Sequence, residues 1–94
     1  MNLDKSKKRI AKKVKMGFQG YPQIAIEYLG TSPNCANEVS IKFTLEEGAP
    51  VQEERFSNKD DVRENEVIQS AIVKMIERSE AKTVLQTAGV TQSQ

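Results

Sequence analysis

Residues 38–45, EVSIKFTL, place the strongest constraint on how this chain of 94 residues folds. Every second residue is apolar, and a period of two places these side chains on one face of a β-strand. They are Val39, Ile41, Phe43 and Leu45. Residues 23–29 repeat the alternation with Ile24, Ile26 and Tyr28. The sequence therefore predicts two strands, joined by the turn-forming residues 30–37, with apolar faces that need a cover.

A helical stripe in the second half of the chain predicts that cover. Its apolar residues recur at spacings of one, three and four, as on one face of a helix. They are Val67, Ile68, Ala71, Ile72, Met75 and Ile76. Acids before the stripe and basic residues after it complement a helix dipole, and Ser57 with Asp60 fits a capping box. We expect the helix to lie across the sheet, with five residues buried together: Ile41, Phe43, Ile68, Ile72 and Met75.

Two valines do not fit this stripe. Val62 and Val73 project nearly opposite to it, so either the helix begins after Val62 or both residues contact something beyond the sheet.

A third strand is expected over residues 51–57, VQEERFS. Three of its seven residues are charged, which is typical of an edge strand that avoids pairing with other chains. Residues 86–94 show no periodicity, and we expect a flexible polar tail there.

The first twenty residues allow two interpretations. As a helix, they form a narrow apolar stripe flanked by lysines; as a strand, Val14, Met16 and Phe18 alternate with Lys13, Lys15 and Gly17. We favour a mobile or helical arm over residues 3–12, followed by a strand over residues 13–19 that pairs with residues 23–29.

Together these elements predict an α+β fold. We expect an antiparallel sheet of three to four strands, packed on one long C-terminal helix, with a basic N-terminal arm. The expected organisation is an arm over residues 1–12, a single α+β domain over residues 13–85 and the tail over residues 86–94.

Charge is distributed unevenly along the chain, although the formal net charge is only +1. Residues 1–20 hold seven basic side chains and one acid, a net charge of +6, whereas the remaining residues hold seven basic and twelve acidic side chains, a net charge of −5. Such asymmetry is typical of an interaction segment for an anionic partner. It also suits an arm that docks on its own acidic body.

The residues that most catalytic and metal sites need are missing. The chain has no histidine and one cysteine, so it lacks the commonest general base and the ligands of a structural zinc site. No phosphate-binding loop or dinucleotide glycine fingerprint is present. We therefore expect a protein that is not an enzyme, with no catalytic residue, metal or cofactor.

The cysteine and the adjacent carboxylates do not indicate a catalytic or metal-binding site. Cys35 has no partner for an internal disulfide, which favours a reducing cytoplasm, and no nearby basic residue that would activate its thiol. Adjacent carboxylate pairs, such as Glu53 with Glu54, point to opposite faces of a strand and are typical of a solvated surface. No apolar run approaches the length of a membrane span.

Two function classes remain. The first is a small protein-interaction or regulatory module without enzymatic activity; the second is a nucleic-acid-associated protein whose basic arm contacts phosphate. In the second class, Phe18 and Tyr21 would stack on bases. The candidate contacts for an anionic partner are Lys5, Lys7, Lys8, Arg9, Lys12, Lys13 and Lys15. A protein partner is the first expectation, and the oligomeric state is left open.

If the arm is a helix, the order helix, three strands, helix is similar to that of the double-stranded-RNA-binding domain. That family grips phosphate with a lysine cluster at the start of its last helix. Here the corresponding segment, NKDDVRENE, carries four acids against Lys59 and Arg63. The resemblance is therefore one of element order alone.

Overall fold

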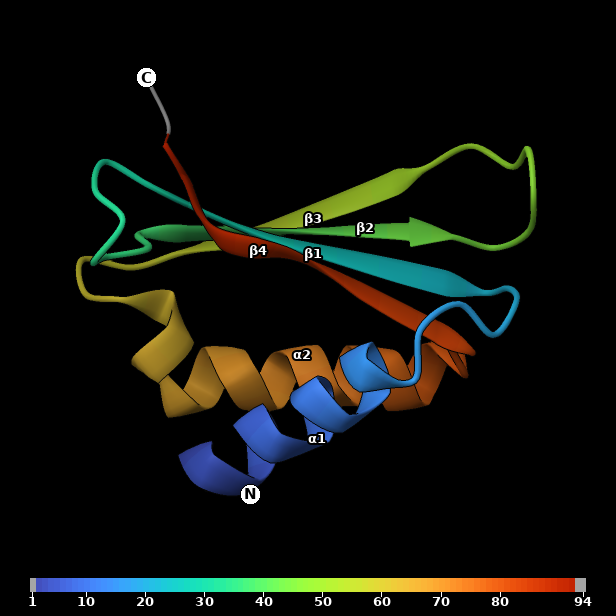
Figure 1. Cartoon of the computed structure of the whole chain (residues 1–94), viewed down its shortest axis with the longest axis horizontal. Coiled ribbons are helices and arrows are strands. Elements are labelled where there is room, and N and C mark those ends of the chain that lie inside the picture. Colours follow the sequence, from blue (N-terminus) through green and yellow to red (C-terminus); the bar gives the residue numbers. More distant parts are fainter. Residues whose placement is uncertain (1, 93–94) are drawn as a thin grey trace.

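The structure is a computed structural model that describes residues 2–92. It contains a four-stranded sheet with two helices on the same face (Figure 1). The elements are α1 (Leu3–Lys15), β1 (Gln23–Gly30), β2 (Glu38–Thr44), β3 (Gln52–Ser57), the 3-10 helix η1 (Val62–Glu64), α2 (Glu66–Ser79) and β4 (Thr83–Gln92). The α+β class and the single small domain are as predicted.

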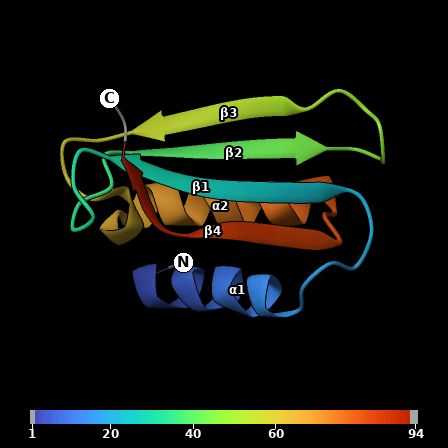
Figure 2. The same cartoon turned by 45° about the horizontal axis from the view of Figure 1, so that its top comes forward.

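The sheet is mixed, with the strand order β3-β2-β1-β4 (Figure 2). β1 and β2 pair antiparallel, as do β2 and β3, and β3 occupies the predicted edge. β4 instead pairs parallel with β1, so the prediction of a purely antiparallel sheet was wrong. The long connection through β2, β3 and α2 returns the chain to the other side of β1, which is the kind of crossover that a parallel pair requires.

β4 also corrects the prediction of a flexible tail, because residues 83–92 form the second edge of the sheet. Residues 93–94 lie outside the described part of the chain. A bulge interrupts the pairing: Ile26 lies opposite Gln86, whereas Tyr28 lies opposite Val90. The extra residues in β4 break the period of two, and this explains why the sequence showed no strand pattern there.

α2 begins at Glu66, and therefore after Val62, which was one of the two explanations for the positions of Val62 and Val73. Its N-cap is Asn65, whose side chain accepts a hydrogen bond from the Ile68 backbone N–H at 2.9 Å. Asp61 caps η1 instead, so the predicted capping box of Ser57 and Asp60 does not form. Val67, placed on the stripe by its spacing, is 78% exposed because it falls on the solvent side of the helix.

The core lies between the sheet and the helices. Ile41, Ile68 and Ile72 are buried in it, as predicted. Phe43 and Met75 are only partly buried and pack against its border. Both side chains stay partly exposed because they line an open groove between β2, β3 and the last turns of α2.

The N-terminal segment is a helix through Lys15, so the strand predicted over residues 13–19 was wrong, while the helical alternative for the arm was correct. The side chain of Asn2 caps the first turn by accepting a hydrogen bond from the Lys5 backbone N–H at 2.8 Å. Gly17, at φ +71°, ends the helix, because a left-handed residue after the last turn suits glycine. The local alternation of Val14, Met16 and Phe18 was coincidental, since burial of the helical stripe decides the conformation.

Candidate interaction surface

Helix α1 is anchored to the rest of the molecule by its buried stripe. Ser6 is fully buried, and its hydroxyl lies 3.2 Å from that of Ser70 on α2. Ile10, one turn further, is 3% exposed and belongs to the core. The segment expected to be an arm is therefore a packed element beside α2 and β4 (Figure 2).

Two basic residues of α1 form ion pairs with the acidic body. Lys7 Nζ lies 2.8 Å from Glu64 Oε1, just before α2, and Arg9 Nη1 lies 2.9 Å from Glu77 Oε1 on α2. All four side chains are largely exposed, so each pair adds orientation more than stability. Two of the seven basic residues of α1 therefore dock on the acidic body, as the alternative interpretation of the charge asymmetry suggested.

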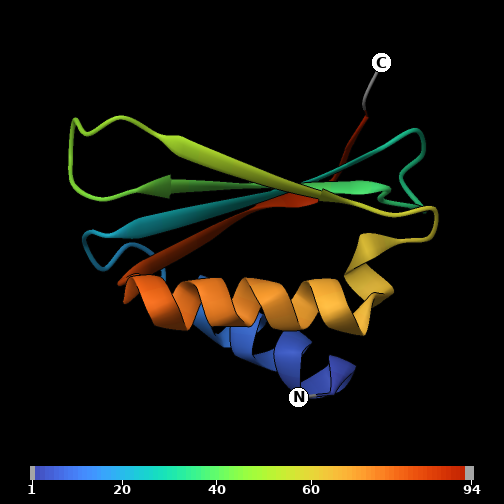
Figure 3. The same cartoon turned by 180° about the vertical axis from the view of Figure 1, so that it is seen from behind.

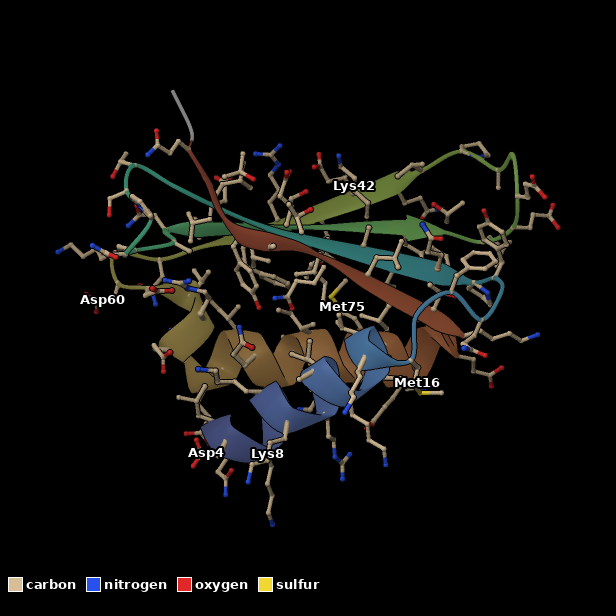
Figure 4. All side chains as sticks on the ribbon, in the orientation of Figure 1. Asp4, Lys8, Met16, Lys42, Asp60 and Met75 are labelled. Atoms are coloured by element: carbon tan, nitrogen blue, oxygen red, sulfur yellow. The ribbon has the colours of Figure 1, made fainter. Side chains whose placement is uncertain are left out.

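Four other basic residues of α1 form a lysine stripe on its outer surface: Lys5, Lys8, Lys12 and Lys15. Their spacings of three and four place them on one face, opposite the buried Ser6 and Ile10. All four are exposed, and within residues 2–92 none of them lies within ion-pairing distance of an acid. Figure 4 shows Lys8 extending away from the body. The stripe is available to an anionic partner.

An apolar groove lies between α1 and α2, beside the lysine stripe. Its volume is about 440 Å³, and Val73 and Ile76 of α2 line its floor. Met16, at the end of α1, is 51% exposed and adds an apolar wall. The border is charged and comprises Arg9, Lys12, Lys13 and Glu77. We call this the α1–α2 groove; three of the predicted anionic-partner residues border it.

Val73 is the residue that could have revealed this groove from the sequence. Its spacing predicts a side chain that points away from the sheet-facing stripe of α2. In the structure, this side chain is buried against α1. Met16 gave no such signal, because its exposure depends on where α1 ends.

The predicted stacking residues lie in the connection that follows α1. Phe18 and Tyr21 contact each other edge to face, with ring centroids 5.6 Å apart and planes at 77°. Phe18 is 60% exposed. The buried hydroxyl of Thr83 fixes this connection, because it accepts a hydrogen bond from the Gln19 backbone N–H at 2.7 Å and donates one to the Gly20 carbonyl at 2.6 Å. The aromatic pair is therefore held at the surface next to the end of α1.

A polar pocket of about 400 Å³ lies on the other side of α1, and Lys7, Tyr28, Arg63 and Gln69 contribute to its lining. Gln69 Nε2 donates hydrogen bonds to Tyr28 Oη and to the Val62 carbonyl, both at 3.1 Å. Burial raises the pKa of Tyr28 above the usual value of a phenol. These groups satisfy one another, which is typical of a structural network.

The remaining sequence candidates show no catalytic or metal-binding arrangement. No group of three or more potential metal ligands occurs among residues 2–92. Cys35 is half-buried, and its Sγ lies 3.7 Å from the side-chain amide of Asn37. Asp61 is bound by the guanidinium of Arg63, which holds the pKa of that carboxyl below its usual value. None of the described helices is long and apolar enough to cross a membrane.

No protein-family model, no curated protein and no solved structure matches this chain. The order helix, three strands, helix is present, but β4 extends it and the acidic start of α2 departs from the RNA-binding pattern as noted above. Any function must therefore be argued from the surfaces of this structure.

Proposed function

We propose that this chain is a protein-interaction module without enzymatic activity, and that the α1–α2 groove binds an acidic, amphipathic helical segment of a partner. The observation that supports this proposal is the combination of an apolar floor and a basic border in one groove. Met16, which is 51% exposed, offers apolar contact beside the buried Val73 and Ile76, while Lys12 and Lys13 favour acidic side chains at the border.

The lysine stripe supports the same partner from outside the groove. Positive charge next to an interface attracts an acidic partner and increases the association rate, while apolar contacts in the groove slow dissociation. A partner helix with one apolar face and acidic flanks satisfies both requirements. A purely acidic chain satisfies only the first.

A designed peptide tests this proposal. The probe is a 16-residue helical peptide with leucines on one face and glutamates beside them, and its control is a scrambled peptide of the same composition. We expect the designed peptide to bind about tenfold more tightly than the scrambled one, measured by fluorescence anisotropy. Met16→Ser removes an exposed apolar wall and should abolish most of that difference. Val67→Ser changes an exposed apolar residue outside the groove lining and should not.

Two results would contradict the proposal. Equal affinity for the designed and scrambled peptides would reduce the interaction to charge alone. Unchanged binding by Met16→Ser would place the peptide elsewhere.

A second candidate function, binding of nucleic acid, is favoured by the lysine stripe. Lys5 to Lys15 span about 15 Å of helix, at the 1.5 Å rise per residue of an α-helix. Such a row of lysines can contact successive phosphates irrespective of sequence, and Phe18, close to its end, is available for stacking on unpaired bases.

Salt dependence separates this candidate from the first. Replacing Lys5, Lys8 and Lys15 by glutamine leaves the groove lining intact. If the stripe contacts phosphate, this variant should flatten the logarithmic salt dependence of duplex binding by about 2 to 3, since each lost contact removes about 0.9. The measurement is a titration with mixed-sequence DNA and RNA at several salt concentrations. Absent binding, or an unchanged slope, excludes the nucleic-acid function.

A further inference from the structure

β3 is an uncovered edge on the side of the molecule away from α1. In Figure 3, β3 and α2 lie nearest the viewer, and α1 lies behind them. The other edge, β4, is interrupted by its bulge and contacts α1. β3 has neither a bulge nor a helix over it, and its six residues pair with β2 in one continuous register. Its charged side chains disfavour a partner strand of like charge.

The β2–β3 register shows which backbone N–H and C=O groups of β3 are not used in pairing with β2. The Asn58 N–H donates to the Asn37 carbonyl at 2.9 Å, and these two residues continue the β2–β3 register. Hydrogen-bonded pairs alternate along an antiparallel ladder, so Phe56 and Glu54 direct their backbone groups toward β2. Glu53 and Arg55 therefore direct their N–H and C=O groups away from the sheet, where an additional strand can bind them.

Beneath this edge lies the groove between β2, β3 and the end of α2. Its volume is about 440 Å³. The half-buried Phe43 and Met75 line it from opposite sides, and Figure 4 shows Met75 pointing from α2 toward the sheet. A strand added to β3 would project every second side chain toward the helix layer, and thus over this groove.

The border of the groove is acidic. The Glu54 side chain lies on the same face as its pairing partner Ile41 and lines the groove, and Arg78 is the one basic residue among its described lining. The Glu53 carboxylate lies on the opposite face of the sheet, where it accepts a hydrogen bond from Ser40 and pairs with Arg55. Glu46 and Glu47, in the exposed turn between β2 and β3, add to this charge. A partner that binds here should therefore carry basic residues beside its apolar one.

We infer that the β3 edge and its groove bind an extended, basic peptide segment of a partner protein, which pairs with β3 and places one large apolar side chain between Phe43 and Met75. Open backbone groups, an apolar groove and an acidic border occur together only on this side, among the described residues. This surface is separate from the α1–α2 groove, and its partner has the opposite charge.

Peptide selection tests the inference. Random eight-residue peptides displayed on phage would be selected against the full chain, and the enriched sequence made synthetically. We expect a large apolar residue with lysine or arginine within two positions of it. Arg55→Pro removes the open N–H of Arg55 but leaves the β2 ladder, and should weaken binding about tenfold or more. Arg55→Ala loses the same side chain but keeps the N–H, and should bind within about threefold of wild type.

A third variant does not alter the backbone. Glu54→Lys, at an exposed position, should weaken the selected peptide about tenfold by reversing the border charge. Met16→Ser should leave it unchanged, which distinguishes this site from the α1–α2 groove. Three results would each overturn the inference. The first is that no such peptide is enriched, and the second is that Arg55→Pro and Arg55→Ala bind the peptide equally. The third is that the protein alone forms a dimer that Arg55→Pro dissociates.

Discussion

Buried polar side chains join segments that are distant in the sequence. Ser6 contacts Ser70, Gln69 joins β1 to η1 through Tyr28 and Val62, and Thr83 holds the connection after α1. Within the described residues, no buried side-chain nitrogen or oxygen lacks a hydrogen-bond partner. Since an unpartnered buried polar group is costly, these residues specify one arrangement of the helices on the sheet.

Asp61 should make the stability of the protein depend on pH. Its side chain is 17% exposed, accepts hydrogen bonds from the Arg63 guanidinium and backbone, and has a lowered pKa in the folded state. The unfolded pKa of an aspartate is about 3.9, so this stabilisation is complete above that pH and is lost as the pH falls through the folded pKa. Asn is an equally good cap, so Asp61→Asn removes mainly the charge.

We therefore expect Asp61→Asn to be less stable than wild type at pH 7, with a difference that shrinks below about pH 4. Urea denaturation at several pH values measures both effects. Asp60→Asn is the matched control, because Asp60 is exposed and the structure shows no ion pair for it in the described part of the chain. A difference that stays constant with pH would contradict the role assigned to the Asp61 charge.

At the scale of elements, β1, β2 and α2 could be predicted because their apolar residues follow one clear period, and β3 because its charges are typical of an edge strand. β4 could not, since its bulge breaks the period and its burial depends on a parallel pairing with β1. α1 was ambiguous because both periods occur in residues 13–18. Packing on α2 decides between them, and the sequence contains no local signal for that packing.

Ile10 tests whether α1 is an integral part of the fold. It is 3% exposed, so Ile10→Ala should lower the free energy of unfolding by about 2 to 5 kcal/mol, the range for truncating a buried aliphatic side chain. Lys8→Ala, on the outer face of the same helix, should change it by less than about 0.5 kcal/mol. Chemical denaturation measures both. A loss below about 1 kcal/mol for Ile10→Ala would mean that the N-terminal segment is a loose arm after all.

Over the whole molecule, the two charged regions lie on opposite sides. The basic helix α1 lies against α2 and β4, while the acidic turn and border of β3 form the far edge of the sheet (Figure 2). The basic residues of the candidate site could be predicted from the distribution of charge along the sequence. The groove beside them could not, because it exists only where α1 and α2 meet. The partner proposed for each side therefore has the charge opposite to that side.

The most direct test of the α1–α2 groove is a nuclear magnetic resonance titration of the full chain with the designed acidic peptide. Backbone chemical shifts should first show a helix over residues 3–15. On addition of the peptide, amide shifts should then change at residues that line or flank the groove, above all Lys12, Lys13, Met16 and Val73, and not along β3. Shift changes confined to β3, or no saturable change at any residue, would contradict the account.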